Sequence, residues 1–189
     1  MIGGRPSVQE YIKLNKKIIP IPEKETSGLR KLCLNLHNEK RALHNAGPLG
    51  YNDELETFAQ EWAEALIRSK KFEHRPSNPY GENLYLHQDI KDQMPTNEQA
   101  LSRAVRLWYD EVRAFKMHFG KELMLKQLID MPETGHFTQL VWKESTAVGL
   151  GIARGKDAVV VCCNYAPSGN VINKFVENVA PAVRSKRRK

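Results

Sequence analysis

Apolar residues recur at steps of three and four along three segments of the chain, which predicts three amphipathic helices. The first runs from about residue 29 to residue 43, and Asn52 is a suitable N-cap for the second because two acidic residues follow it. On the third helix, Trp108, Glu111 and Phe115 share one line, so Glu111 borders the buried face. The apolar positions are Leu29, Leu32, Leu36 and Leu43; Leu55, Phe58, Ala59, Trp62 and Leu66; and Leu101, Ala104, Val105, Trp108, Val112 and Phe115.

The last third of the chain changes to patterns typical of strands. Between residues 148 and 153, apolar residues alternate with small ones, which predicts a strand with one apolar face and one face that a helix can approach closely. Residues 154–157 form a predicted turn, and residues 158–163 are apolar throughout, as in a central strand covered on both faces. Helices followed by strands predict an α+β fold.

Length and composition favour one folded domain with a tail at each end. The chain has 189 residues, of which 41% are hydrophobic, and this is enough to bury one core. We expect an extended N-terminal arm over residues 1–27, the folded domain over residues 28–180, and a basic tail over residues 181–189.

The positive charge is concentrated at the two ends. Of the formal net charge of +7, residues 184–189 contribute +5 and residues 1–24 contribute +3, so residues 25–183 carry −1. Basic ends suit anionic lipid headgroups; nucleic-acid phosphates would also attract them, but we do not expect nucleic acid as the partner. A tail that only increases solubility is the alternative. The residues predicted to bind membranes electrostatically are Arg184, Lys186, Arg187, Arg188 and Lys189.

The chain lacks the sequence features of exported and membrane-spanning proteins. No apolar run approaches the roughly 20 residues that cross a bilayer, and residues 1–22 lack the apolar segment of about 7 to 15 residues that a signal peptide requires. Only Cys33, Cys162 and Cys163 are present, which favours a reducing compartment and buried reduced thiols. A regulatory redox pair is the alternative. We expect a protein that is cytoplasmic or peripheral on the cytosolic face of membranes.

Four titratable side chains stand in settings that a solvated residue would not need. His136 lies within Gly-His-Phe-Thr-Gln-Leu-Val-Trp. Glu82 lies in a predicted Gly-Glu-Asn loop and is flanked by a glycine and two tyrosines. His74 precedes a Pro-rich segment, and Glu111 borders the buried face of the third helix. We expect these side chains at the edge of the core, facing a cleft.

The chain resembles the CAP superfamily, which comprises cysteine-rich secretory proteins, antigen 5 and plant pathogenesis-related proteins. Four segments carry the resemblance, over roughly residues 29–180: His-Asn-Glu-Lys-Arg at 37–41, Gly-Glu-Asn-Leu at 81–84, Gly-His-Phe-Thr-Gln-Leu-Val-Trp at 135–142, and Asn-Tyr-Ala-Pro-Ser-Gly-Asn at 164–170. The resemblance implies a three-layer α-β-α sandwich with a mainly antiparallel central sheet. It also implies that His74, Glu82, Glu111 and His136 form a cleft tetrad, whereas His37 belongs to a family motif but not to the tetrad.

Two neutral imidazoles, those of His74 and His136, can bind a divalent ion such as Zn²⁺. Two ligands are one fewer than an ordinary catalytic zinc site has, so we expect weak, pH-sensitive metal binding. The alternative for the tetrad is a hydrogen-bonded group that joins the helices without metal. A metal-dependent hydrolase or protease, with Glu82 or Glu111 as base or water-positioning group, is the enzyme alternative to the binding protein that we expect.

The resemblance further implies lipid partners, because CAP proteins are associated with sterols and fatty acids. The nearest branch in style is the intracellular Golgi-associated plant-pathogenesis-related type, which attaches to anionic membranes. Ile2 stands where N-myristoylation needs glycine, so we do not expect that anchor. We expect Tyr80, Tyr85 and Leu86 to line a lipid or sterol site, with ordinary core packing as the alternative. A third hypothesis is a protein-interaction scaffold, with other proteins or a second copy of the chain as partner.

Overall fold

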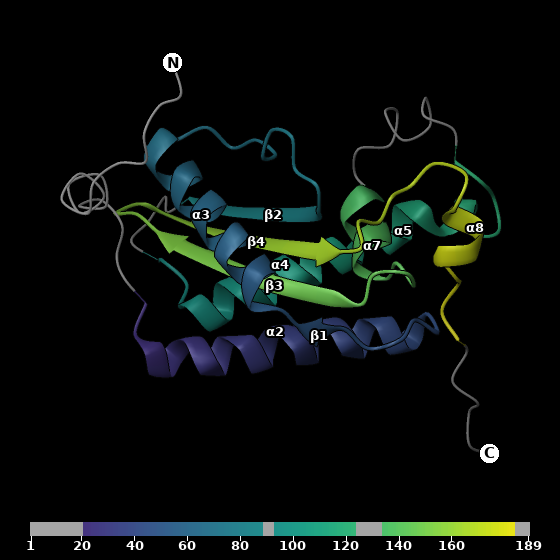
Figure 1. Cartoon of the computed structure of the whole chain (residues 1–189), viewed down its shortest axis with the longest axis horizontal. Coiled ribbons are helices and arrows are strands. Elements are labelled where there is room, and N and C mark those ends of the chain that lie inside the picture. Colours follow the sequence, from purple (N-terminus) through teal and green to yellow (C-terminus); the bar gives the residue numbers. More distant parts are fainter. Residues whose placement is uncertain (1–20, 89–92, 124–133, 184–189) are drawn as a thin grey trace.

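The computed structural model describes residues 21–88, 93–123 and 134–183, which form helices and strands joined by loops (Figure 1). The helices are α2 (Glu23–Leu43), α3 (Asp53–Ser69), α4 (Asn97–Asp110), α5 (Val112–Phe115), the 3-10 helix η2 (Lys116–His118), α7 (Gly135–Leu140) and α8 (Phe175–Asn178). The strands are β1 (Gly50–Tyr51), β2 (Gly81–Gln88), β3 (Ala147–Arg154) and β4 (Ala158–Ala166).

The four strands form one mixed sheet in the order β1-β3-β4-β2. The two central strands, β3 and β4, pair antiparallel, and β2 pairs antiparallel with β4 along its whole length. Only the two-residue strand β1 runs parallel to its neighbour, β3. The predicted α+β fold is therefore confirmed, and the mainly antiparallel sheet carries one short parallel edge.

Helices cover both faces of this sheet. The larger core cluster joins α2, α4 and α7 to one face, and a smaller cluster joins α3 to the other. On the α3 side, a Cβ added to Gly149 would clash with the backbone of Glu56, and one added to Gly151 would clash with the backbone of Ala59. This close approach confirms that the small residues of β3 make room for a helix.

The helix starts depend on local capping. The predicted N-cap is confirmed: the Asn52 side-chain oxygen accepts a hydrogen bond of 2.8 Å from the Leu55 amide. At the start of α4, Thr96 and Gln99 form a reciprocal capping box. Both devices satisfy amide groups that have no partner within the helix, so the sequence alone could indicate these two boundaries.

Two segments differ from the expectations. Helix α2 begins at Glu23, so residues 23–27 are helical although they were expected to belong to an extended arm. The Gly-Glu-Asn segment was expected to be a loop, but it opens strand β2, with Glu82 opposite Asn164 and Asn83 opposite Cys163. Residues 1–20 and residues 184–189 of the predicted basic tail lie outside the described residues. In the part of the chain that is described, no helix is both long and apolar enough to cross a membrane.

Candidate metal-binding cleft

A cavity of about 330 Å³ lies where the loop after α3, the start of β2, the N-terminus of α7 and the segment after β4 meet. Three of the four tetrad residues line it. The lining residues are His74, Asn78, Tyr80, Gly81, Glu82, Gly135, His136, Gln139, Ser168, Gly169 and Asn170. Every side chain in this lining carries a polar group, so the cavity can hold an ion or a polar group.

The first pair in the cleft is His74 with Glu82. Nδ1 of His74 lies 2.7 Å from Oε1 of Glu82, and the carboxylate is almost fully buried while the imidazole is 66% exposed. The carboxylate also accepts the backbone N–H of Arg75 and a side-chain N–H of Asn78. Glu82 is therefore held from several directions, and it fixes the orientation of the His74 ring.

The second pair is His136 with Glu111. Nδ1 of His136 lies 2.6 Å from Oε1 of Glu111, and the other carboxylate oxygen accepts the backbone N–H groups of His136 and Phe137, each at 3.0 Å. Glu111 therefore also satisfies free amide groups at the start of α7. The His136 ring stacks on Trp108 of α4, with ring centroids 6.2 Å apart. These contacts hold the second imidazole rigidly at the cleft.

Each glutamate binds Nδ1 of its histidine, so Nε2 is the nitrogen left for a ligand. Among the described residues, neither Nε2 of His74 nor Nε2 of His136 has a recorded hydrogen bond. A carboxylate on one ring nitrogen and a metal on the other is the usual arrangement of zinc-binding histidines. The donor set therefore fits a divalent ion. The glutamates are already used as acceptors, so their role in this arrangement is to position the imidazoles.

The hydrogen bond that His74 donates to Glu82 raises the pKa of His74 above its ordinary value, although burial opposes this effect. Because a metal binds only the neutral imidazole, the raised pKa makes protons stronger competitors at this site. Metal binding at the cleft should therefore weaken at a higher pH than the ordinary histidine pKa would indicate.

The segment after β4 completes the cleft wall. Gln139 of α7 accepts the Gly169 amide and donates to the Ser145 hydroxyl, and the Asn170 side chain bonds both Thr138 and the Gly135 carbonyl. These residues were not predicted as site residues. All lie in or beside the family motifs at 135–142 and 164–170, so the motifs could have indicated them. The sequence alone did not show which residues of these motifs face the cleft.

The three predicted lipid-lining residues lie in different places. Tyr80 lines the cleft, and its hydroxyl donates to Glu54. Tyr85 packs against the larger core cluster, whereas Leu86 packs against the smaller one on the other face of the sheet. Consecutive residues of a strand point to opposite faces, so Tyr85 and Leu86 do not line one pocket with Tyr80.

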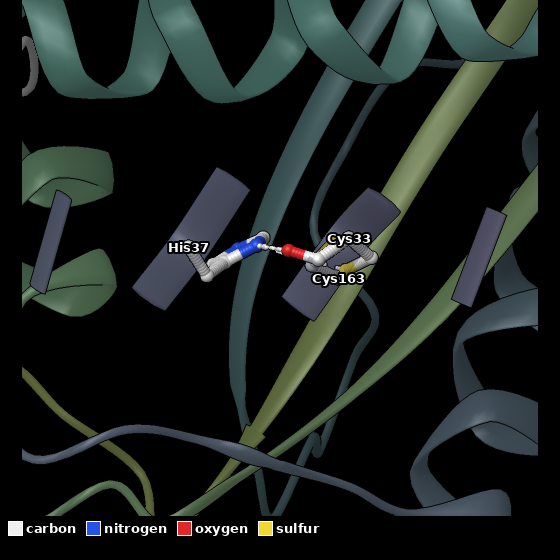
Figure 2. A group of neighbouring side chains, drawn as sticks. All are labelled: Cys33, His37 and Cys163. Atoms are coloured by element: carbon white, nitrogen blue, oxygen red, sulfur yellow. Dashed lines mark hydrogen bonds between the residues drawn. The ribbon is translucent and has the colours of Figure 1, made fainter. Parts of the chain in front are cut away.

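A second group of metal-ligand side chains lies inside the core. Donor atoms of Cys33 and His37 on α2 and of Cys163 on β4 all lie within 4.8 Å of one another, and all three residues are fully buried (Figure 2). In the described part of the chain, this is the one group of three or more His, Cys, Asp or Glu residues that meets this spacing. Burial raises the pKa of the Cys163 thiol well above its usual value, whereas the hydrogen bond with Cys163 lowers the pKa of the Cys33 thiol to about 5. The thiolate that a metal needs is therefore disfavoured at Cys163.

Both nitrogens of His37 are already bonded. Nδ1 donates to the Cys33 carbonyl oxygen at 2.8 Å, so Nε2 is the acceptor for the Tyr165 hydroxyl, also at 2.8 Å. The Tyr165 hydroxyl in turn accepts from the Asn83 side chain, which also donates to the His136 carbonyl. The cluster is therefore satisfied without an ion. All three cysteines, including Cys162, are buried and free of disulfides.

Comparisons with known proteins agree with this architecture. The sequence model of the cysteine-rich secretory protein family matches residues 34–165. The chain is 32% identical to human Golgi-associated plant pathogenesis-related protein 1 over 154 residues, covering 78% of this chain and 90% of that protein. It is 34% identical to protein PRY2 of Saccharomyces cerevisiae over 154 residues, but these cover 78% of this chain and only 40% of PRY2.

A solved structure shows the same fold. The crystal structure of NaASP2 with Zn²⁺ aligns with a TM-score of 0.63 at 24% identity, over 82% of this chain and 86% of that one. The family match spans more than half of the chain, and its boundaries enclose all four tetrad residues, from His74 to His136. The chain belongs to the cysteine-rich secretory protein (CAP) family.

Proposed function

We propose that this chain is a lipid- or sterol-binding CAP domain that associates with anionic membranes and whose cleft binds a divalent cation weakly. The observation that carries the cation proposal is the pairing of each cleft imidazole with a glutamate at Nδ1, which leaves Nε2 for an ion. Two imidazoles leave other coordination positions of the ion for water or a polar ligand group. The crystal structure of NaASP2, which shares this fold, is a structure with Zn²⁺, and this supports the choice of ion.

The membrane part of the proposal rests on charge and on a relative. The C-terminal sequence Arg184–Lys189 carries five cations, which an anionic lipid surface attracts. Human Golgi-associated plant pathogenesis-related protein 1, of which the alignment covers 90%, is named for its association with the Golgi apparatus. This supports a membrane location for this chain too. Because every side chain that lines the cleft carries a polar group, we propose that the cleft takes a polar headgroup while the apolar part of the lipid lies outside it.

We propose a binding function rather than a hydrolytic one. The carboxylates of Glu82 and Glu111 accept hydrogen bonds from histidine nitrogens and backbone amides. A general base must be free to take a proton from water or substrate, and these carboxylates are already engaged. Zinc-dependent turnover of a peptide, ester or phospholipid that disappears in Glu111→Gln would overturn this part of the proposal.

The test of the membrane proposal is co-sedimentation of the full chain with phosphatidylcholine vesicles, with and without phosphatidylserine. We expect binding to the anionic vesicles that weakens in high salt, because salt screens the attraction between exposed charges. A chain that ends at Val183 should bind more weakly. We expect a loss of about fivefold for each removed cation that would lie near the membrane surface. No binding of the full chain to anionic vesicles at low salt would refute the proposal. Mass spectrometry of co-purified lipids identifies the ligand class.

A further inference from the structure

The outward face of α4, α5 and η2 carries a basic stripe. Residues at steps of three and four along these consecutive helices are exposed, while the opposite side of α4 packs into the core. We call this surface the α4 stripe: Arg103, Arg106, Leu107, Arg113, Lys116 and Met117. Four of its six residues are cations, and the acidic residue beside them is Asp110.

Most of these cations have no acidic partner. Arg113 lies 3.5 Å from Asp110, with both side chains largely exposed. Within the described residues, no hydrogen bond or ion pair is recorded for the side chains of Arg103, Arg106 and Lys116. Three unpaired cations on one helical face create a positive potential that solvent alone screens.

Helix α3, which covers the other face of the sheet, differs from the α4 stripe because most of its charges are paired. It contains five acidic residues, and four of them form ion pairs: Asp53 and Glu56 with Arg30, Glu64 with Arg68, and Glu61 with Arg75. The α4 side carries unpaired cations and the α3 side carries paired charges, so the α4 side is the one that an anionic surface attracts.

Two apolar side chains project from the α4 stripe. Leu107 is 48% exposed and Met117 is 74% exposed, although both belong to residue types that usually lie inside a protein. Apolar side chains among cations suit the headgroup region of a bilayer, where the cations meet phosphates and the apolar groups insert. Nucleic-acid phosphates would satisfy the cations but not the apolar side chains, so a lipid surface is the better match.

From these observations we infer that the α4 stripe is the membrane-facing surface of this protein and binds anionic lipid headgroups. The inference rests on the proposed membrane association and adds the surface and the orientation. The α3 side then faces away from the membrane, because most of its charges are already paired within the protein.

The test compares two variants of the full chain that lose three positive charges each. The stripe variant is Arg103→Gln with Arg106→Gln and Lys116→Gln, and the control is Lys24→Gln with Lys71→Gln and Lys156→Gln, all at exposed positions outside the stripe. With phosphatidylserine-containing vesicles at low salt, we expect about 100-fold weaker binding of the stripe variant, since each cation near the surface contributes about fivefold. The control should lose less than about threefold. A second variant, Leu107→Ser with Met117→Ser, should weaken the binding that persists at high salt.

Each other outcome overturns the inference in a distinguishable way. Equal loss in the stripe variant and the control would mean that only net charge matters. No loss in either would assign binding to the terminal sequences alone. A stripe variant that lost affinity for duplex DNA but not for vesicles would identify a nucleic-acid surface. If the unmodified chain did not bind anionic vesicles, the proposed membrane function would fail, and the inference with it. Thermal unfolding of all variants checks that the fold is intact.

Discussion

The cleft and the buried cysteine cluster contain similar metal-ligand side chains in opposite circumstances. In the cleft, His74 and His136 are 66% and 30% exposed, and within the described ranges each ring is hydrogen-bonded through Nδ1 only. In the buried cluster, His37 is fully buried and bonded at both nitrogens, with Cys33 and Cys163 beside it. The spacing of the donor atoms favours the buried cluster as a metal site. The free Nε2 atoms and the exposure of the imidazoles favour the cleft.

This difference is the reason for proposing the cleft as the metal site, because proximity of donor atoms is not sufficient for metal binding. An imidazole nitrogen can bind a metal only if it carries no proton, and a thiol must first lose one. At His37, the Nδ1 proton is held by a carbonyl oxygen, and Nε2 already accepts from Tyr165. In the cleft, the carboxylates place the proton on Nδ1 and leave Nε2 for an ion. Three experiments test this contrast.

The largest effect should come from removing the cleft imidazoles. We expect His74→Ala with His136→Ala to reduce zinc affinity by at least about 100-fold, because no imidazole then remains in the cleft. Titration calorimetry near neutral pH measures it. The matched control is Cys33→Ala with Cys163→Ala, which removes two donors from the buried cluster and should leave zinc affinity unchanged. If the double cysteine variant lost zinc binding and the double histidine variant kept it, the metal site would be the buried cluster and not the cleft.

An intermediate effect should come from Glu82→Gln. Losing the carboxylate that orients His74 should reduce zinc affinity by about 10- to 100-fold near pH 8, as for other groups that support metal-binding histidines. The pH dependence should change as well. In the unmodified chain, Glu82 raises the pKa of His74. As the pH is lowered, zinc affinity should therefore begin to fall while the pH is still above the ordinary histidine pKa.

Without the carboxylate, the pKa of His74 should return toward its ordinary value, so the midpoint for zinc loss should move to lower pH. Calorimetry across a pH series measures both the affinity and the midpoint. A midpoint that stayed constant would mean that Glu82 does not control the protonation of His74.

The smallest effect on zinc should come from Tyr165→Phe. This change removes a hydroxyl that donates to His37 and accepts from Asn83, so buried polar groups lose partners. We expect the free energy of unfolding to fall by about 1–3 kcal/mol, with zinc affinity unchanged. Urea denaturation and calorimetry measure the two quantities. Tyr85→Phe, a half-buried tyrosine with no recorded hydroxyl hydrogen bond among the described residues, is the control. A large loss of zinc affinity in Tyr165→Phe would show that the buried cluster and the cleft are coupled.

Repetitive local patterns made much of the fold predictable. The steps of three and four that mark α2, α3 and α4 reflect one buried face on each helix, and the alternation along β3 reflects the two faces of a sheet. The Asn52 cap was visible because the capping bond joins residues three apart. The Gly-Glu-Asn segment was misjudged as a loop, because strand β2 lies at a sheet edge, and its pairing with β4 crosses about 80 residues of sequence.

By itself, the sequence determined the fold class, the family and the types of side chain available for chemistry, because these depend on local periodicity and on short motifs. Only the tertiary structure decided how those side chains are used. Folding brings His74 to Glu82 and His136 to Glu111, and it connects His37 to Tyr165 across 128 positions. It also places the cations of α4 and the carboxylates of α3 on opposite sides of one sheet. Hydrogen-bond partners, burial and the direction of charge depend on contacts between distant segments, so spacing along the chain could not show them.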